Sequence, residues 1–340
     1  MSLTEVQFTG ATVEEAPARA IQGRSPWQLA WRRLRADRVA VASAIVIVVL
    51  CIIALAAPLI ASIVGHQPAI TCTSCTSAQG LPAGPSGRFL LGTDNLGRDV
   101  LIRMVYGARV SLLVGLSSTA IATVAGVVVG LLAGYYGGVI DGVLARFMDV
   151  VLAFPYLILA LALVTVFGPS LPMVIAVIAF FSWAALARIV RGQTMSIKEK
   201  EYVEAARAIG TSPIRIMLVD ILPNVIAPVL VVATLLVPTA IVFESTLSYL
   251  GLGIQPPTAS WGNMISDSQN YYQVAWWFLI FPAGALLITT LAFNLLGDGV
   301  RDAIDPSTER IFAARRRRKR ELPVEGPSLV EPPRPVITEE

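Results

Sequence analysis

Six long apolar runs divide this chain, and short polar segments separate them. The runs cover about residues 39–64, 110–134, 143–167, 171–189, 225–250 and 274–296. Each is long enough for a transmembrane helix, which needs about 20 predominantly apolar residues. The pattern therefore predicts an all-α fold, a polytopic membrane helix bundle with six transmembrane helices. Pro155 lies inside the third run, where we expect it to kink the helix.

The segment 65–109 separates the first two runs and is predicted to be an external loop followed by an amphipathic helix. Pro and Gly are frequent in its first part, as is typical of loops. From Asp94 to Ala108 apolar residues return at helical spacing, and Arg98, Asp99 and Arg103 fall away from the apolar face. We expect this helix to lie on the outer membrane surface and to lead into the second span.

The polar segment 196–224 lies between the fourth and fifth runs and predicts two short helices joined by a tight elbow. In the first helix the apolar positions recur at helical spacing at Tyr202, Val203, Ala206 and Ile209. Glu204 and Arg207 then lie together on another face. Gly210 can adopt the left-handed conformation that ends a helix.

The second helix of the elbow is predicted to begin after Ser212, a good N-cap, with Pro213 in its first position. Its apolar stripe consists of Ile214, Met217, Leu218 and Ile221. We expect Pro223 to break this pattern at the edge of the fifth span. The elbow is therefore placed at the membrane surface.

Small and polar residues inside the spans are candidates for packing or function. Gly126, Gly130 and Gly134 are spaced by four, which lets another helix approach closely, although glycines are also ordinary residues of membrane helices. Glu244 in the fifth run is a candidate pathway residue, because ionisable groups inside a span are often functional. Water or an interhelical hydrogen bond could instead satisfy it. Asn294 is a weaker candidate, near the inner interface or paired between helices.

Composition and charge agree with a membrane protein and set its orientation. Apolar residues make up 55% of the chain, charged residues 14%, and the mean hydropathy is +0.69. Of 26 Lys and Arg residues, 22 fall on one side of the six-span topology, at Arg146 and within residues 1–38, 188–220 and 298–340. Because positive residues gather on the cytoplasmic side, both termini are predicted to be cytoplasmic.

The chain is thus expected to have five parts. Residues 1–38 form a cytoplasmic tail, in which Trp27 and Trp31 among arginines indicate either an amphipathic helix or a plain topology signal. Residues 39–64 form an uncleaved first span, and 65–109 the external loop and helix. Residues 110–297 form a five-helix core that includes the elbow. Residues 298–340 form a basic, partly disordered tail.

The residues predict no enzyme. The chain has no Gly-rich phosphate loop followed by Lys and Ser or Thr, and its one histidine, His66, is too few for a multi-histidine metal site. Cys72 and Cys75 lie in the external loop, where they could form a local disulfide or remain free thiols. A net charge of +3 gives no argument for nucleic acid. We expect no cofactor and no metal in this chain.

Several short motifs resemble those of one transporter family. Glu204-Ala205-Ala206, followed by Gly210 and Leu222-Pro223, is similar to the EAA motif in membrane subunits of bacterial ATP-binding-cassette (ABC) importers. Five further motifs resemble the dipeptide and oligopeptide permease branch, specifically its C-type subunit. They are Leu91–Asp94 with Gly97–Asp99, Gly107–Arg109 with Ser111-Leu112, Leu247–Gly253, Gly297–Gly299, and Arg301-Asp302. The resemblance covers roughly residues 27–306.

This resemblance implies an ABC importer permease fold in the bacterial inner membrane. It implies that the first elbow helix is a coupling helix that docks on an ATPase. The coupling residues are then Glu204, Ala205, Ala206, Arg207, Gly210, Leu222 and Pro223. The implied partners are a homologous second permease, two ATPases that bind ATP and Mg²⁺, and an external substrate-binding protein. The implied cargo is a di- or oligopeptide, or alternatively nickel. The rival hypotheses are an ion-coupled secondary transporter working alone and a membrane scaffold or sensor.

Overall fold

The computed structural model describes residues 26–72, 75–76 and 80–304. Its helices are α1 (Pro26–Ala36), α2 (Arg38–Leu55), α3 (Ala57–Val64), α4 (Val100–Tyr136), α5 (Gly138–Ala153), α6 (Tyr156–Phe167), α7 (Leu171–Ile197), α8 (Glu201–Ala208), α9 (Pro213–Arg215), the π-helical segment η2 (Ile216–Ile221), α10 (Leu222–Tyr249), α11 (Trp261–Ser268) and α12 (Trp276–Ile304). The described residues contain no strand beyond an isolated bridge between Thr93 and Asp99. The expected tails at 1–25 and 305–340 lie outside these residues.

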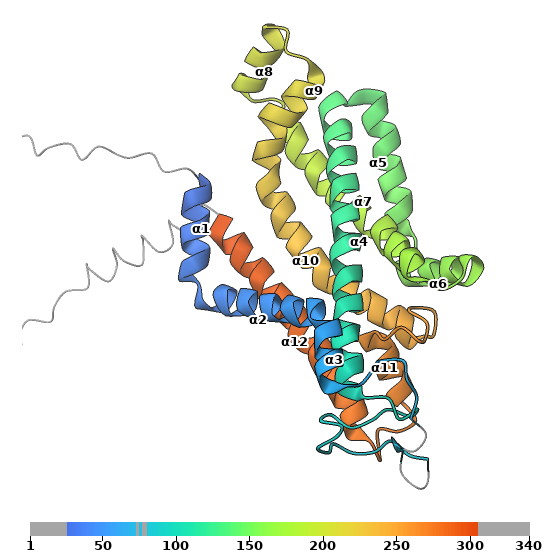
Figure 1. Cartoon of the computed structure of the whole chain (residues 1–340). Helices are drawn as coiled ribbons and strands as arrows, with labels where there is room; N and C mark the ends of the chain where they lie inside the picture. The colour runs from blue at the N-terminus through green and yellow to red at the C-terminus, as the bar shows by residue number, and fades with distance from the viewer. Residues whose placement is uncertain (1–25, 73–74, 77–79, 305–340) are drawn as a thin grey trace, which may run out of the picture.

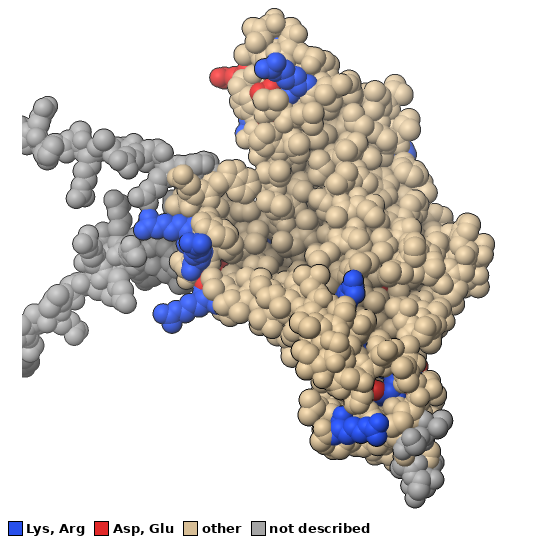
Figure 2. All heavy atoms as spheres, in the orientation of Figure 1, with Lys and Arg blue, Asp and Glu red and all other residues tan. Residues whose placement is uncertain are grey.

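The helices form a bundle in which α8 and the loop before α4 lie at opposite ends (Figure 1). By length and composition, five of them can cross a membrane: α2, α4, α7, the continuous helix from Pro213 to Tyr249, and α12. The pair α5 and α6 gives a sixth span if it crosses as one unit. Figure 2 shows groups of charged side chains at the top, at the left edge and near the bottom of one face, with few charges over the rest of it. These findings agree with the predicted bundle.

The sequence predicted that Pro155 only kinks the third span, and the bend in the structure is larger than a kink. Helix α5 ends at Ala153, α6 begins at Tyr156, and the two axes differ by 85°. Phe154 has extended backbone angles, φ −78° and ψ 138°. A residue before proline is driven out of the helical region by contact with the proline ring. The span is therefore broken into two helices.

The expected boundaries around the first and second spans also change. The run 39–64 is divided at Ala56, after which Pro58 occupies the first turn of α3. Conversely, the predicted outer amphipathic helix and the second span are one helix, α4, without a break at Arg109. Asp99 caps its start, because the carboxylate accepts a hydrogen bond from the backbone N–H of Leu101 at 2.8 Å.

The polar residues before and within α4 face inward, which contradicts the expected polar surface. Arg98 and Arg103 are only 5% and 1% exposed. Both guanidinium groups donate to the buried carboxylate of Asp94, with Arg98 Nε 2.6 Å from Asp94 Oδ2. Asp267 of α11 lies 3.6 Å from Arg98 and 3.5 Å from Arg103. Burial raises the pKa of Asp267, while Arg98 opposes this shift. The ion cluster ties α4 to α11.

The closest helix contact joins α4 to α7 through the three glycines spaced by four. A Cβ added at Gly126, Gly130 or Gly134 would lie 2.9, 2.7 or 2.8 Å from a backbone carbonyl oxygen of α7. Such distances leave no room for a side chain, so the glycines are what permits this approach. The expectation of close helix packing at these glycines is confirmed.

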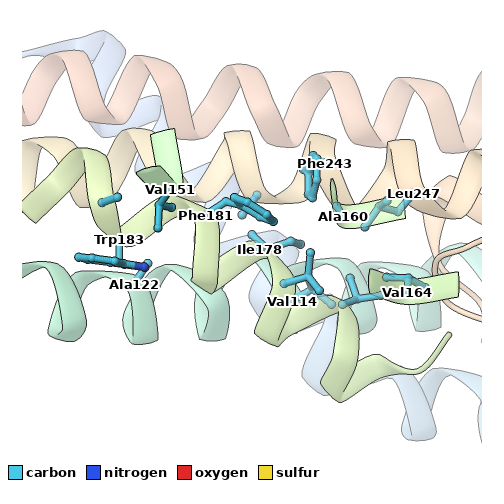
Figure 3. Packing of buried hydrophobic residues seen from close by; sticks show 14 of the residues in the cluster. Val114, Ala122, Val151, Ala160, Val164, Ile178, Phe181, Trp183, Phe243 and Leu247 are labelled. Atoms are coloured by element: carbon cyan, nitrogen blue, oxygen red, sulfur yellow. The ribbon is translucent and has the colours of Figure 1, made fainter. Parts of the chain in front are cut away.

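The largest core cluster lies where α4 and α7 meet α5, α6 and α10. Figure 3 shows its side chains, among them Val114, Ala122, Val151, Ala160, Val164, Ile178, Phe181, Trp183, Phe243 and Leu247. Residues of α6 pack there although α6 is turned away from α5. The core therefore holds the broken span against the bundle.

We predict that Gly130→Ala destabilises the protein, because the added methyl group must push α7 away. Overpacking of this kind costs about 1–3 kcal/mol. The matched control is Gly192→Ala on α7, where an added Cβ has no neighbour within 4 Å. Thermal unfolding of the purified protein in detergent measures the effect. Equal unfolding temperatures for the two variants would contradict the proposed contact.

Candidate functional site

Helix α8 and the turn after it project from the bundle between α7 and α10 (Figure 1). The helix begins after Lys200, whose backbone is extended, and ends at Ala208. Gly210 has φ +81°. Its N–H donates to the carbonyl of Arg207 at 2.9 Å, and the N–H of Thr211 donates to the carbonyl of Ala206 at 3.0 Å. This pair of bonds is a Schellman motif, which satisfies the last carbonyls of the helix.

One fully buried side chain of α8 packs into the core of the protein. Val203 is 0% exposed and packs with Ile216, Met217 and Ile221 of η2 in a core cluster that also includes Val190 of α7. Because this side chain lies beside both neighbouring helices, a force on α8 reaches α7 and η2 directly.

The opposite side of α8 and the elbow tip are exposed. Glu204 and Ala205 are exposed, while Ala206 is half-buried. Ile209 was expected on the inward apolar face, but it is 83% exposed, and Tyr202 is 43% exposed. The inward face predicted from spacing is thus wrong at these two positions. Their exposure instead adds apolar area to the tip of a projection.

The resemblance implies that Arg207 is a coupling residue. Its guanidinium group lies over the ring of Tyr135, 5.0 Å from the ring centroid. Tyr135 belongs to the last turn of α4. The cation–π contact therefore links α8 to the end of α4, although the Arg207 side chain is still exposed.

Pro223 does not break the helix after the elbow, which corrects the prediction. The helix runs on from Pro213 through η2 into α10, with Leu222 and Pro223 in the first turn of α10. The N–H of Leu222 bonds the carbonyl of Met217, five residues earlier. This π-helical register accommodates a proline that has no N–H of its own. The elbow and the fifth span are therefore one rod.

The apolar stripe predicted for the second helix of the elbow is also only partly buried. Met217 and Ile221 face the core, as predicted, and Ile216 joins them. Ile214 and Leu218, which the spacing placed on the same face, are 64% and 53% exposed. Leu218 lies within the π-helical segment, where the angle between successive residues departs from that of an α-helix, so a stripe counted at 3.6 residues per turn is displaced there. Ile214 precedes this segment, in the first turn of the helix.

Glu244 lies on α10 and is fully buried inside this chain, at 0% exposed. Its carboxylate accepts hydrogen bonds from the hydroxyl groups of Ser111 at 3.1 Å and Ser248 at 2.7 Å. Ser111 belongs to α4, so the contact joins two spans. The geometry corresponds to the alternative of an interhelical hydrogen bond, and it offers no support for contact with a pathway.

Cys72 and Cys75 form a disulfide in the loop before α4. Cys75 is 8% exposed and belongs to the core, and a backbone bond of 3.0 Å joins Cys75 N to Cys72 O. The bond closes a small ring beside His66, whose Nδ1 lies 2.6 Å from Asp99. It thereby stiffens the approach to the start of α4.

These features define a polytopic helical membrane protein with a projecting elbow that is anchored to two spans at one end. A family model for the inner membrane component of binding-protein-dependent transport systems matches residues 126–310. A model for the N-terminal transmembrane domain of oligopeptide transport permease C matches residues 25–69. The chain belongs to this family of bacterial inner membrane transport permeases, which are not enzymes.

Named relatives support the assignment. The chain is 44% identical over 286 residues to the oligopeptide transport system permease protein OppC of Escherichia coli K12, covering 84% of this chain and 93% of the relative. It is 43% identical over 223 residues to the di/tripeptide permease protein DppC of Pseudomonas aeruginosa, covering 66% and 74%. It is 42% identical over 284 residues to the dipeptide permease protein DppC of Bacillus subtilis, covering 83% and 86%.

A solved structure supports the fold alone. A chain of the MetNI methionine ABC transporter, in an inward-facing conformation, superimposes with a TM-score of 0.51 and 19% identity. The match covers 60% of this chain and 97% of that chain. The predicted importer permease fold is confirmed. Membership of this family also excludes the ion-coupled secondary transporter considered from sequence.

We predict that Glu244→Leu destabilises the protein, whereas Glu244→Gln has a smaller effect. Leucine leaves buried serine hydroxyl groups without an acceptor, at about 1–3 kcal/mol for each unsatisfied group. Glutamine keeps an acceptor oxygen for Ser248. Thermal unfolding in detergent compares the variants. A leucine variant as stable as the original protein would show that the hydrogen bonds are dispensable.

Proposed function

We propose that this chain is the C-type permease subunit of an ATP-driven importer of di- or oligopeptides. It forms half of the translocation pathway together with a homologous second permease. Two ATPases bind ATP and Mg²⁺, and an external binding protein delivers the peptide. The observation that carries the proposal is the α8 elbow, a capped helix with an exposed tip that is rigidly anchored at its base.

The elbow has the properties that docking on an ATPase requires. Ala205 keeps α8 slim on the side that would enter a groove, and Ala206 lets the inner side of α8 lie close to the core cluster around Val203. Ile209 and Ile214 expose apolar side chains on the projecting tip, and exposed apolar surface of this kind is typical of protein contacts. Glu204 offers a charge at the edge of the contact.

The rod behind the elbow supplies the coupling. When two ATPases close on ATP, they displace α8, and the displacement passes through Val203 to η2. Since η2 continues without a break into α10, the fifth span moves with it. Rigid-body motion of this kind is a common form of switching between inward and outward openings.

The named relatives favour peptides over nickel as cargo. They are described as oligopeptide, di/tripeptide and dipeptide permease proteins, and another, GsiD of Escherichia coli, as a glutathione permease protein. Glutathione is itself a tripeptide, so all four relatives are named for the transport of peptides. Nickel remains the control cargo in the test below.

We predict that Gly210→Val uncouples transport without preventing assembly. A β-branched residue at φ +81° is strained by roughly 1–2 kcal/mol, so the elbow must change shape. Peptide uptake per ATP hydrolysed by the reconstituted complex should fall severalfold. The matched control is Gly168→Val, which has φ +86° and equally open surroundings but lies at the turn before α7. Normal uptake per ATP hydrolysed in the Gly210 variant would show that this glycine has no mechanical role.

The function itself is tested by reconstituting the permease with its second permease, ATPases and binding protein. We expect short peptides to stimulate ATP hydrolysis and nickel to leave it unchanged. Stimulation by nickel alone would overturn the peptide assignment. Uptake by this chain without ATPases would overturn the proposed coupling.

A further inference from the structure

A cavity with a mixed polar and apolar lining lies between α6, α10 and α12, inside the part of the protein that crosses the membrane. Its volume is about 350 Å³. Its polar lining consists of Tyr156, Thr239, Thr246, Thr290 and Asn294, and none of its lining residues carries a charge. Cavities that hold small ligands have volumes of about 300–1,000 Å³. The size is therefore suitable for part of a small solute.

The cavity extends well into the membrane. Thr246 lies one turn from the outer end of α10, at Tyr249. Thr239 lies about 15 Å from that end at 1.5 Å per residue, which is half of a hydrocarbon core about 30 Å thick. The cavity thus reaches from near the outer surface toward the middle of the bilayer.

The threonine hydroxyl groups present acceptor atoms to the cavity. Thr239, Thr246 and Thr290 each donate the hydroxyl hydrogen to the carbonyl four residues earlier, at 3.0, 2.9 and 2.9 Å. A hydroxyl oxygen that has donated its hydrogen keeps two lone pairs as acceptors. The N–H groups of a peptide backbone are the complementary donors.

Asn294 shows that this face is not covered by lipid. Its side chain is exposed, and within the described residues its amide has no hydrogen-bond partner. An amide surrounded by hydrocarbon would lose its hydrogen bonds to water without replacement, which is unfavourable. Water, a polar solute or a polar group of the second permease must therefore reach it.

Glu244 lies on a different side of α10 from the residues that line the cavity. It is on the same helix but is enclosed against α4, so its charge does not reach the cavity. Thr239, Val242 and Thr246 follow one another at spacings of three and four and form the cavity stripe. The helix thus buries its one carboxylate on one side and presents uncharged polar groups on the other.

We propose that this cavity is the surface along which a peptide passes this chain, and that it recognises the peptide backbone and not the charge of the side chains. The proposal rests on the proposed function. Hydroxyl and amide groups bind the backbone shared by all peptides, and an uncharged lining neither attracts nor repels acidic and basic side chains. Acidic, basic and neutral peptides then pass with similar ease.

Water access is tested first, because it does not depend on the cargo. In a Cys51→Ala background, Thr290→Cys and Asn294→Cys are prepared separately in the whole complex in proteoliposomes. A membrane-impermeant maleimide should label both, since thiols react as thiolates, which need water. The matched control is Val124→Cys, 65% exposed on an apolar stripe of α4, where labelling should be lost. If either cavity position is not labelled, the proposal is overturned. It is also overturned if both positions crosslink to the second permease in place of labelling.

Charge selectivity is tested next with Asn294→Asp, Asn294→Lys and Asn294→Gln. The aspartate variant should reduce uptake of acidic tripeptides about tenfold relative to basic ones, and the lysine variant should do the reverse. The glutamine variant, which keeps the amide, should import all three classes as the original complex does. Equal losses for acidic, basic and neutral peptides in both charged variants would overturn the proposal. If the original complex imports no peptide, the proposed function fails, while maleimide labelling still decides whether the cavity is filled with water.

Discussion

Helices in a bilayer gain nothing from hiding apolar surface from lipid, so this fold depends on close contact, above all between α4 and α7. Gly126, Gly130 and Gly134 let α4 lie against backbone carbonyl groups of α7. Helix α4 carries the outer ion cluster at one end and Tyr135, beneath Arg207, at the other. Helix α7 leads directly into α8. The seam of glycines therefore joins the external loop to the elbow through two closely packed helices.

The polar side chains in the spans show a consistent rule. Buried charges are paired or hydrogen-bonded: Arg103 with Asp94, and Glu244 with three serine hydroxyl groups. Such groups hold helices together and are removed from any solute. Asn294 differs because it is exposed and has no partner within the described residues. The hydroxyl groups of Thr119, Thr123 and Thr194 also lack a partner among those residues but are buried between helices, so it is exposure at the cavity together with the missing partner that distinguishes Asn294.

Local rules predicted the parts of the site that depend on neighbouring residues. The end of α8 at Gly210 followed from the need for positive φ, and the glycine spacing in α4 followed from the helical repeat. Predictions failed where distant residues decide the outcome. Arg98 and Arg103 looked like a solvated face although Asp94, the carboxylate nearest to both, is close in sequence, and Asp267 of α11, which completes the buried cluster, is remote. Pro223 looked like a helix end because a π turn that absorbs a proline has no local signature. The sequence left two alternatives for Glu244 for the same reason, since burial depends on the partner helices.

The continuous helix from Pro213 to Tyr249 connects the two sites that matter for transport. Its inner end follows the elbow, and its outer half lines the cavity. Pro238 lies in this helix and borders the cavity. A proline inside a helix removes one backbone hydrogen bond and makes a bend at that point easier. Pro228 lies in the same helix, so a push on α8 travels along a rod with two such positions, and the second of them, Pro238, is at the wall of the cavity. The 25 residue steps from Pro213 to Pro238 correspond to about 38 Å of helix at 1.5 Å each, so a single helix connects the elbow to the cavity wall.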